Sequence, residues 1–224
     1  MIRQQDHAAL AADLMARWRG GGLPDHPRRA AILAATREHD NGWQEEDDAL
    51  HLGAGGEPLD FITVPAEVKR RIWPRAVSRL ASRSAYVAAL VAEHARTIYA
   101  PLRGEAGWDL FLAAMEGLRE AQLERLPPPD RGTLPEDYPF VRTGDLLSLV
   151  FCNGWREPQS GPGCRVILEG ITLAVSPDPF GGEAVEFQVD ARAIPARPYR
   201  SREDLQGAYA DGAFVPLRGR AIGV

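Results

Sequence analysis

The stretch VSRLASRSAYVAALVAEHARTI, residues 77–98, decides the fold class. Its inward positions alternate three and four apart over about six turns, the spacing of a helix that buries one stripe of side chains. These positions are Val77, Leu80, Ser84, Val87, Val91, His94 and Ile98. We therefore expect one long buried helix in which His94 faces the interior.

A first helix is expected from Gln4 to Trp18. Leu10, Leu14 and Trp18 follow one another at helical spacing, and counting back three residues from Leu10 places His7 on the same face. A run of three glycines then ends the helix. The pattern predicts that His7 is buried.

The second helix is expected to begin near Asp25 and Pro27, which supply a cap and a first-turn proline. It ends at His39 and Asp40, because the Asn-Gly pair that follows is a typical left-handed stop. The apolar face of this helix continues by helical steps to His39. The adjacent His39 and Asp40 can then point at one place, because the backbone leaves regular geometry there.

The segments that follow are less regular. Residues 42–60 are rich in Gly, Asp and Glu and are expected to form an ordered loop that could act as a lid. A third helix is expected to open at Pro65 and to be interrupted at Trp73-Pro74, because proline removes a backbone donor. Residues 108–118 have the spacing of another amphipathic helix.

Residues 145–152, DLLSLVFC, are apolar on nearly every face, as expected of a helix surrounded by others. Asp145 stands at the start of this expected helix and shares one side with Ser148 and Cys152. Asp145 therefore either points into the interior or caps the helix by accepting hydrogen bonds from free backbone N–H groups.

The last third of the chain changes character. Residues 165–176 and 183–194 are rich in β-branched residues, Ser201 begins a capping box for a short helix, and residues 213–217 have the pattern of a closing strand. We therefore predict a mainly α protein: a helical domain at residues 1–158, with a small β-rich C-terminal appendage at residues 159–224 packed on it, α+β overall.

Composition narrows the range of functions. The chain has 224 residues, of which 45% are hydrophobic and 25% charged, and its net charge is -5. No dense basic block, membrane-spanning run or secretion signal is evident, so we expect a cytoplasmic protein without nucleic-acid or membrane partners. A small-molecule or protein partner is favoured, and a homodimer stays open. The two cysteines form no CxxC, so any metal must be bound by His, Asp or Glu.

Several separate segments each bring a metal-competent group to an inward face. They are His7, His39 with Asp40, His94 and Asp145. A single inward histidine is more often a core residue than a ligand. Burying all of these groups together without compensation would be costly, however, since buried charges need partners or metal. The set therefore predicts a shared site for a divalent metal, with Mn, Fe, Co or Zn as candidates.

The order of these groups resembles the HD superfamily of metal-dependent phosphohydrolases. A histidine comes first, a His-Asp pair follows, and a later aspartate opens an apolar helix. More specifically, the chain is similar to an uncharacterised bacterial family marked by QxxHA and HDxGW motifs. The motifs appear here as residues 4–8, QQDHA, and residues 39–43, HDNGW, and the likeness covers most of the chain.

The resemblance implies an HD-like helical core in which His7, His39, Asp40 and Asp145 hold one divalent ion, with His94 available for a second ion or for substrate. It also implies a hydrolase that acts on a phosphate ester or nucleotide through a metal-activated water. Asp40 would ligate the ion and orient the water, and Arg37 or Arg96 would hold a phosphate.

Two alternatives stay open. In the first, the protein is not catalytic, and the polar cluster binds a small anion or organises the core of a scaffolding protein. In the second, the metal is iron and the protein is an HD-like oxygenase.

Overall fold

The computed structural model describes residues 1–224 and contains nine α-helices and seven strands. The helices are α1 (Gln4–Ala16), α2 (Arg29–Glu38), α3 (Gln44–Ala49), α4 (Ala66–Ala81), α5 (Ala85–Tyr99), α6 (Trp108–Glu124), α7 (Pro128–Arg131), α8 (Leu134–Cys152) and α9 (Arg202–Ala210). The strands are β1 (His51–Leu52), β2 (Pro58–Leu59), β3 (Gln159–Gly161), β4 (Cys164–Glu169), β5 (Thr172–Ser176), β6 (Val185–Ala193) and β7 (Ala213–Gly223). Short 3-10 turns precede α2 and α3 and follow α5.

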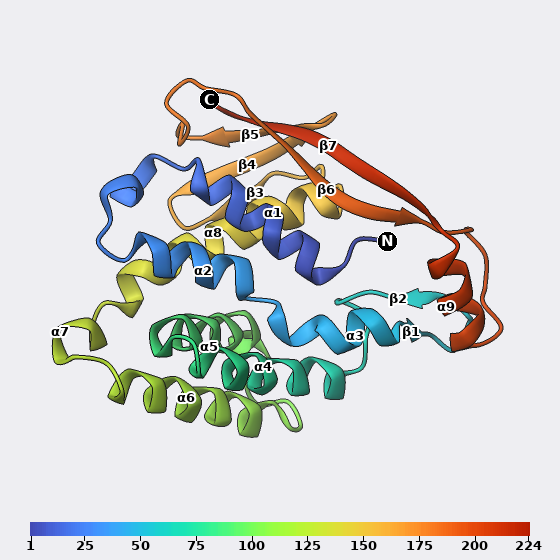
Figure 1. Ribbon diagram of the computed structural model, residues 1–224, viewed down its shortest axis with the longest axis horizontal. Coiled ribbons are helices and arrows are strands. Elements are labelled where there is room, and N and C mark those ends of the chain that lie inside the picture. The colour runs from blue at the N-terminus through green and yellow to red at the C-terminus, as the bar shows by residue number, and fades with distance from the viewer.

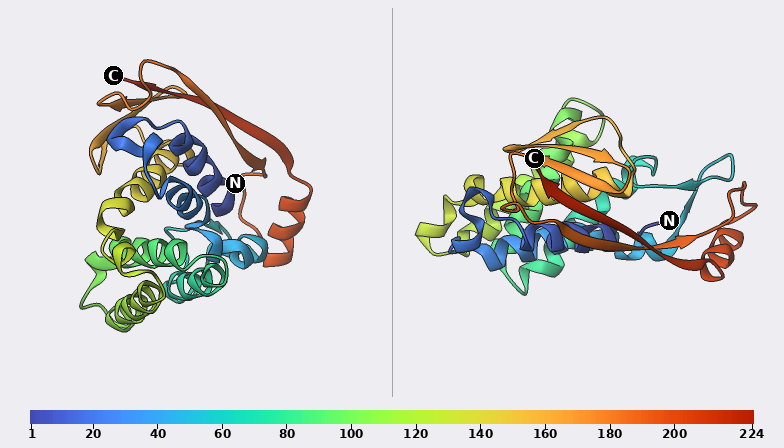
Figure 2. Two further views of the ribbon diagram at one scale, coloured as in Figure 1. Left: turned by 60° about the vertical axis from the view of Figure 1, so that its left-hand side comes forward. Right: turned by 90° about the horizontal axis from the view of Figure 1, so that it is seen from above.

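The elements form three layers (Figure 1). Helices α1, α2 and α8 contact one another in the middle, the larger sheet covers α1 and α8, and α4, α5 and α6 pack below. Figure 2 shows the sheet curving over the middle helices. Helix α5 contacts both α2 and α8 and so joins the lower layer to the middle one.

The larger sheet has five strands in the order β3-β4-β5-β7-β6. Its pairs are antiparallel except for β5 and β7, which run parallel. Side chains along β4 alternate between buried and less buried positions, because successive residues of a strand point to opposite faces. Val166 and Leu168 of β4 and Leu173 and Val175 of β5 are among the residues buried beneath the sheet.

The prediction of a mainly α protein with a small β appendage is wrong, and the fold is a mixed α+β fold. The apolar face of the sheet belongs to the same cluster of 40 buried residues as the helices. The β-rich segments are short and separated by turns, so their individual patterns do not reveal that they join into one sheet. The sheet is therefore a full layer of the core.

The single helix expected over residues 77–98 is two helices. Helix α4 ends at Ala81 and α5 begins at Ala85, where the Ser84 hydroxyl accepts a hydrogen bond from the Val87 backbone N–H at 3.3 Å. The inward spacing continues across the break because α4 and α5 pack against each other and each is buried on that face. Conversely, Pro74 does not interrupt α4, and packing of the buried Ile72 and Trp73 there outweighs the lost backbone hydrogen bond.

The expected helix start at Asp145 is also wrong. Helix α8 begins at Leu134 and continues through Pro139 and Gly144, so Asp145 lies well inside it and cannot be its N-terminal cap. The segment expected as a loop at 42–60 contains α3 and the hairpin formed by β1 and β2. Leu50 of this segment packs with Tyr199 and Leu205 in a second small core.

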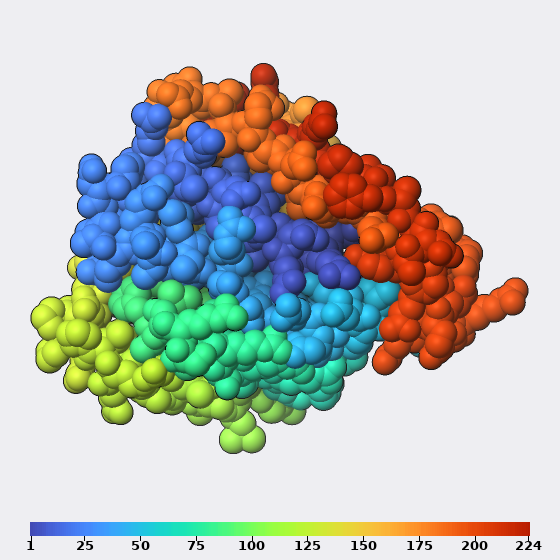
Figure 3. All heavy atoms as spheres, viewed as in Figure 1, coloured from blue at the N-terminus to red at the C-terminus, as the bar shows by residue number.

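The beginning of the chain lies against the C-terminal strands. The Met1 ammonium donates to the Arg192 carbonyl, and the Arg192 N–H donates to the Met1 carbonyl. In the space-filling view the dark blue N-terminal atoms accordingly sit between the orange strands and the cyan segment around α3 (Figure 3). None of the helices combines the length and apolar character needed to cross a bilayer.

Candidate metal centre

His7 lies near the start of α1 and is 2% exposed. Its orientation depends on Ser148 of α8. The Ser148 hydroxyl donates to the Asp145 carbonyl at 3.0 Å, and its oxygen accepts from His7 Nδ1–H at 2.7 Å. The His7 proton is therefore on Nδ1, and the Nε2 lone pair points away from Ser148.

His39 follows the last residue of α2 and is 1% exposed. Its Nδ1–H donates to the Thr36 carbonyl at 2.7 Å, within the last turn of the helix. A carbonyl oxygen can only accept, so this contact also determines which ring nitrogen carries the proton. His39 Nε2 is left facing away from its own helix.

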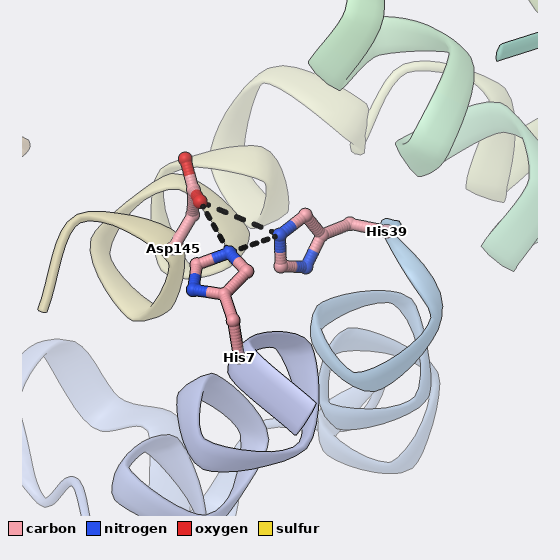
Figure 4. Close-up of side chains that lie close together, drawn as sticks. All are labelled: His7, His39 and Asp145. Atoms are coloured by element: carbon pink, nitrogen blue, oxygen red, sulfur yellow. Dashed lines mark hydrogen bonds and ion pairs between the residues drawn. The ribbon is translucent and has the colours of Figure 1, made fainter. Parts of the chain in front are cut away.

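The two Nε2 atoms meet a carboxylate from the third helix of the middle layer. His7 Nε2 lies 3.2 Å from His39 Nε2 and 3.2 Å from Asp145 Oδ1, and His39 Nε2 lies 3.4 Å from the same oxygen. Figure 4 shows this triangle, with His7 rising from α1, His39 entering from the end of α2 and Asp145 projecting from α8. We call His7, His39, Asp40 and Asp145 the cluster.

Asp40 completes one side of the cluster. Its Oδ2 lies 3.5 Å from both His7 Nε2 and His39 Nε2. Residue 42, which follows in the next turn, has no room for a side chain: a Cβ there would lie 1.9 Å from the Ile72 carbonyl oxygen of α4. The glycine of HDNGW therefore permits the close approach of α4 that closes the site.

His94 lies on α5, at the edge of the cluster. Its Nε2 is 3.6 Å from Asp145 Oδ2, and its Nδ1 is 3.2 Å from the Tyr138 hydroxyl. It is the fifth member of the predicted set, and the structure brings all five residues together. His94 faces the oxygen of Asp145 that His7 and His39 do not share.

Burial and mutual charge shift the protonation of these groups. Burial would lower the pKa of His39, but the Asp40 and Asp145 carboxylates and the Thr36 carbonyl raise it to about 9. Burial would raise the pKa of Asp145, but the adjacent histidines hold it well below its usual value. Burial raises the pKa of Asp40 and lowers the pKa of His94 to about 3. Positive charge at the centre of the cluster is thus favoured.

The donor set fits a divalent metal ion. Ligand atoms about 2.1 Å from one ion lie roughly 3.0–3.4 Å from each other, which is the range of the triangle's distances. Both imidazoles present a lone pair to the centre, and each is oriented by a hydrogen bond at its other nitrogen, as is usual for metal-binding histidines. The three ligand atoms of His7, His39 and Asp145 all lie within 4.8 Å of one another.

Two cavities open beside the cluster. The smaller, of about 280 Å³, is lined by His7, Asp40, His94 and Asp145 and by residues that include Lys69, Trp73 and Tyr99. The larger, of about 400 Å³, lies under the hairpin and the N-terminus. Residues Gln4, His7, Trp43, Phe61 and Leu149 line both cavities.

Sequence reasoning missed the residues that orient the cluster. Ser148 was noted only as a neighbour of Asp145, and no pattern indicated the role of the Thr36 carbonyl. The two arginines expected to hold a phosphate do not line either cavity. Arg37 pairs with Asp13 on the surface, and Arg96 pairs with Glu93 and Glu116.

No curated protein and no solved structure matches the chain. One family does match, over residues 1–196, and the chain therefore belongs to that family, which is described as "Protein of unknown function (DUF3891)".

Proposed function

We propose that this protein is a metal-dependent hydrolase of phosphate esters whose divalent ion is held by His7, His39, Asp40 and Asp145. The observation that carries the proposal is the meeting of two imidazole Nε2 atoms and a carboxylate oxygen at 3.2–3.4 Å. Mixed imidazole and carboxylate ligands suit Mn, Fe, Co and Zn. The order of the ligands along the chain, with its resemblance to HD phosphohydrolases, supports the same reaction class.

A divalent ion at this position would lower the pKa of a bound water from 15.7 toward about 7 and polarise a phosphoryl oxygen. The chain's own residues supply the rest. Asp40 would orient the attacking water by accepting a hydrogen bond from it, and His94 lines the cavity where a substrate oxygen would lie. The buried walls limit access of other water to the reacting atoms.

The proposal is tested by combining metal analysis with an assay for released phosphate. The protein is freed of metal with a chelator, reloaded with Mn, Fe, Co or Zn, and given p-nitrophenyl phosphate. We expect a stoichiometric ion and phosphate release that depends on it. His39→Ala should abolish both.

His26→Gln is the matched control, because His26 faces Asp137 away from the cluster, at 3.3 Å. This variant should keep both the ion and the activity. Wild-type protein that takes up none of the four metals would contradict the proposal. An iron-dependent absorbance band and dioxygen consumption without phosphate release would instead favour an oxygenase.

A further inference from the structure

The two cavities lie next to each other beside the cluster. They share Gln4, His7, Trp43, Phe61 and Leu149. A molecule whose reacting group reaches His7 in the smaller cavity therefore has space for a second portion in the larger one.

The larger cavity is suited to an uncharged, apolar group. Eleven of its 18 lining residues are hydrophobic, and they include Leu50, Leu59 and Phe61. Its carboxylates, Asp47 and Asp60, would repel an anion.

The charged residues of the two cavities indicate how much negative charge can be bound. All but one of the chain's 26 basic residues are arginines, yet no arginine lines either cavity. Polyphosphates are typically held by arginine or by several cations. Lys69, the single lysine of the chain, is the only lysine or arginine that lines either cavity. One compact anionic group therefore fits better than a chain of phosphates.

Trp73 supplies an unused donor in the same wall. It is 3% exposed, and its indole Nε1–H, although close to the Tyr99 hydroxyl, makes no hydrogen bond of good geometry. A buried donor without a partner is unfavourable, so an oxyanion that reached this N–H would be stabilised by it. The neighbouring Tyr99 hydroxyl also remains a donor at neutral pH, because burial raises the pKa of Tyr99 to about 12.

Lys69 lines the same cavity as Trp73 and Tyr99. Its Nζ donates to the Ile62 carbonyl at 2.5 Å, which uses one of its three N–H groups and leaves two for a ligand. Lys69, Trp73 and Tyr99 thus line the same small cavity as the metal ligands and carry donors that an oxyanion can accept from.

We propose that the substrate is a phosphate monoester of an apolar alcohol: its phosphate accepts from Trp73 Nε1–H and Lys69 Nζ, and its organic portion fills the larger cavity. This inference rests on the proposed function. In the reaction, a bond forms between the water oxygen and phosphorus, and the bond from phosphorus to the ester oxygen breaks. The alcohol leaves with one proton of the water, and inorganic phosphate keeps the other.

Binding of phosphonates, which cannot be hydrolysed, tests this assignment without relying on activity. Calorimetric titrations of the metal-loaded full chain compare phenylphosphonate, methylphosphonate and methylenediphosphonate. We expect phenylphosphonate to bind at least about tenfold more tightly than either of the others, since burial of an aryl group contributes more than about 1.4 kcal/mol, the equivalent of tenfold.

Single-residue variants test which side chains bind the phosphonate group and which bind the organic group of the ligand. Trp73→Phe and Lys69→Met should each weaken both monophosphonates about tenfold or more, and Lys69→Arg should restore part of the affinity. Trp18→Phe, at a tryptophan that is 7% exposed and lines neither cavity, is the control and should change neither. Leu59→Asn should weaken phenylphosphonate alone. If Trp73→Phe does not fold, Lys69→Met still tests the phosphate end.

The outcomes separate this inference from the proposed function. Methylenediphosphonate binding as tightly as phenylphosphonate, or wild-type affinity in both Trp73→Phe and Lys69→Met, would overturn the inference. In that case metal-dependent hydrolysis of another ester, such as ATP, would leave the proposed function standing. Phosphonate binding with the expected pattern, but no metal-dependent release of phosphate, would overturn the proposed function and leave the assignment of the ligand site intact.

Discussion

His7 Nε2 and His39 Nε2 face each other at 3.2 Å, and each ring is turned toward the other by an acceptor at its Nδ1. Two imidazole lone pairs at this distance, next to the Asp145 carboxylate, repel unless a cation lies among them. In the metal-free protein a second proton on His39 meets this requirement, and, although burial would lower the pKa of His39, the Asp40 and Asp145 carboxylates that attract this proton raise it to about 9. Proton and metal ion thus compete for one place.

Removing the group that orients His7 should weaken metal binding without unfolding the protein. In Ser148→Ala the His7 ring loses its 2.7 Å hydrogen bond, and we expect affinity for Zn or Mn to fall about 10- to 100-fold. Competition with a chelator of known affinity measures the change. Ser82→Ala, which removes an exposed hydroxyl that donates to Arg79, is the control. Unchanged affinity in Ser148→Ala would show that Ser148 does not position a ligand.

Metal affinity should rise with pH. Below about pH 9 the ion must displace a proton from His39, so affinity should increase about tenfold per pH unit between pH 7 and pH 9 and then level off. Asp145 stays ionised throughout, because its pKa lies well below the usual value. Titrations in buffers of different ionisation enthalpy count the released protons. Affinity independent of pH over this range would exclude His39 as the displaced group.

The metal-free protein should respond to pH in the opposite direction. The folded pKa of His39, about 9, lies above its ordinary value of 6.5. The stability that protonated His39 contributes is therefore fully present below about pH 6.5 and is lost as pH rises through about 9. Urea unfolding of metal-free protein at pH 6.5 and pH 9 measures this loss, and His39→Gln should reduce it.

Asp47 is expected to destabilise the protein at alkaline pH. Burial, together with the charge of Asp40, raises the pKa of Asp47 to about 7, although it accepts a hydrogen bond from the Gln4 backbone N–H. Its folded pKa lies above the ordinary 3.8, so stability is lost as pH rises through about 7. Asp47→Asn should therefore be more stable than wild type at pH 8, by at most about 4 kcal/mol, and the difference should shrink at pH 5.

Metal-free protein is used for this comparison, because an ion would offset the charge of Asp40. Asp48→Asn is the matched control, since the exposed Asp48 pairs only with Arg3 in the structure, at 3.3 Å. A wild-type protein as stable as Asp47→Asn at pH 8 would contradict the raised pKa.

Gly144 sets the distance between α8 and the other two helices of the cluster. A Cβ at this position would lie 2.7 Å from both Met15 Cγ and Thr36 Cγ2. Gly144→Ala should therefore cost about 1–3 kcal/mol of stability and weaken metal binding, because Asp145 moves with the helix. Gly117→Ala in α6, where a Cβ meets nothing within 4 Å, should instead stabilise by about 0.5–1 kcal/mol. Thermal unfolding of both variants distinguishes the two effects.

Periodicity predicted much of the local structure but not where some helices begin and end. It placed His7, His39 and His94 on buried faces, and it predicted the short helix after Ser201, whose hydroxyl accepts from the Asp204 N–H. It failed at the break between Ala81 and Ala85, because two consecutive helices that pack against each other happen to keep the spacing of one helix. It also failed at Asp145, because the helix continues through a proline and a glycine that ordinarily indicate an end.

The sequence by itself determined which donors are available and which helix faces carry them. Two cysteines without a CxxC leave imidazole and carboxylate as the ligands, and helical spacing turns them inward. Only the tertiary structure decided that these faces meet within hydrogen-bond distance, that Ser148 and the Thr36 carbonyl orient the rings, and that no arginine lines the cavities. The physical reason is that spacing along a chain specifies the direction of a side chain relative to its own helix, whereas distances between helices depend on how all their surfaces pack together.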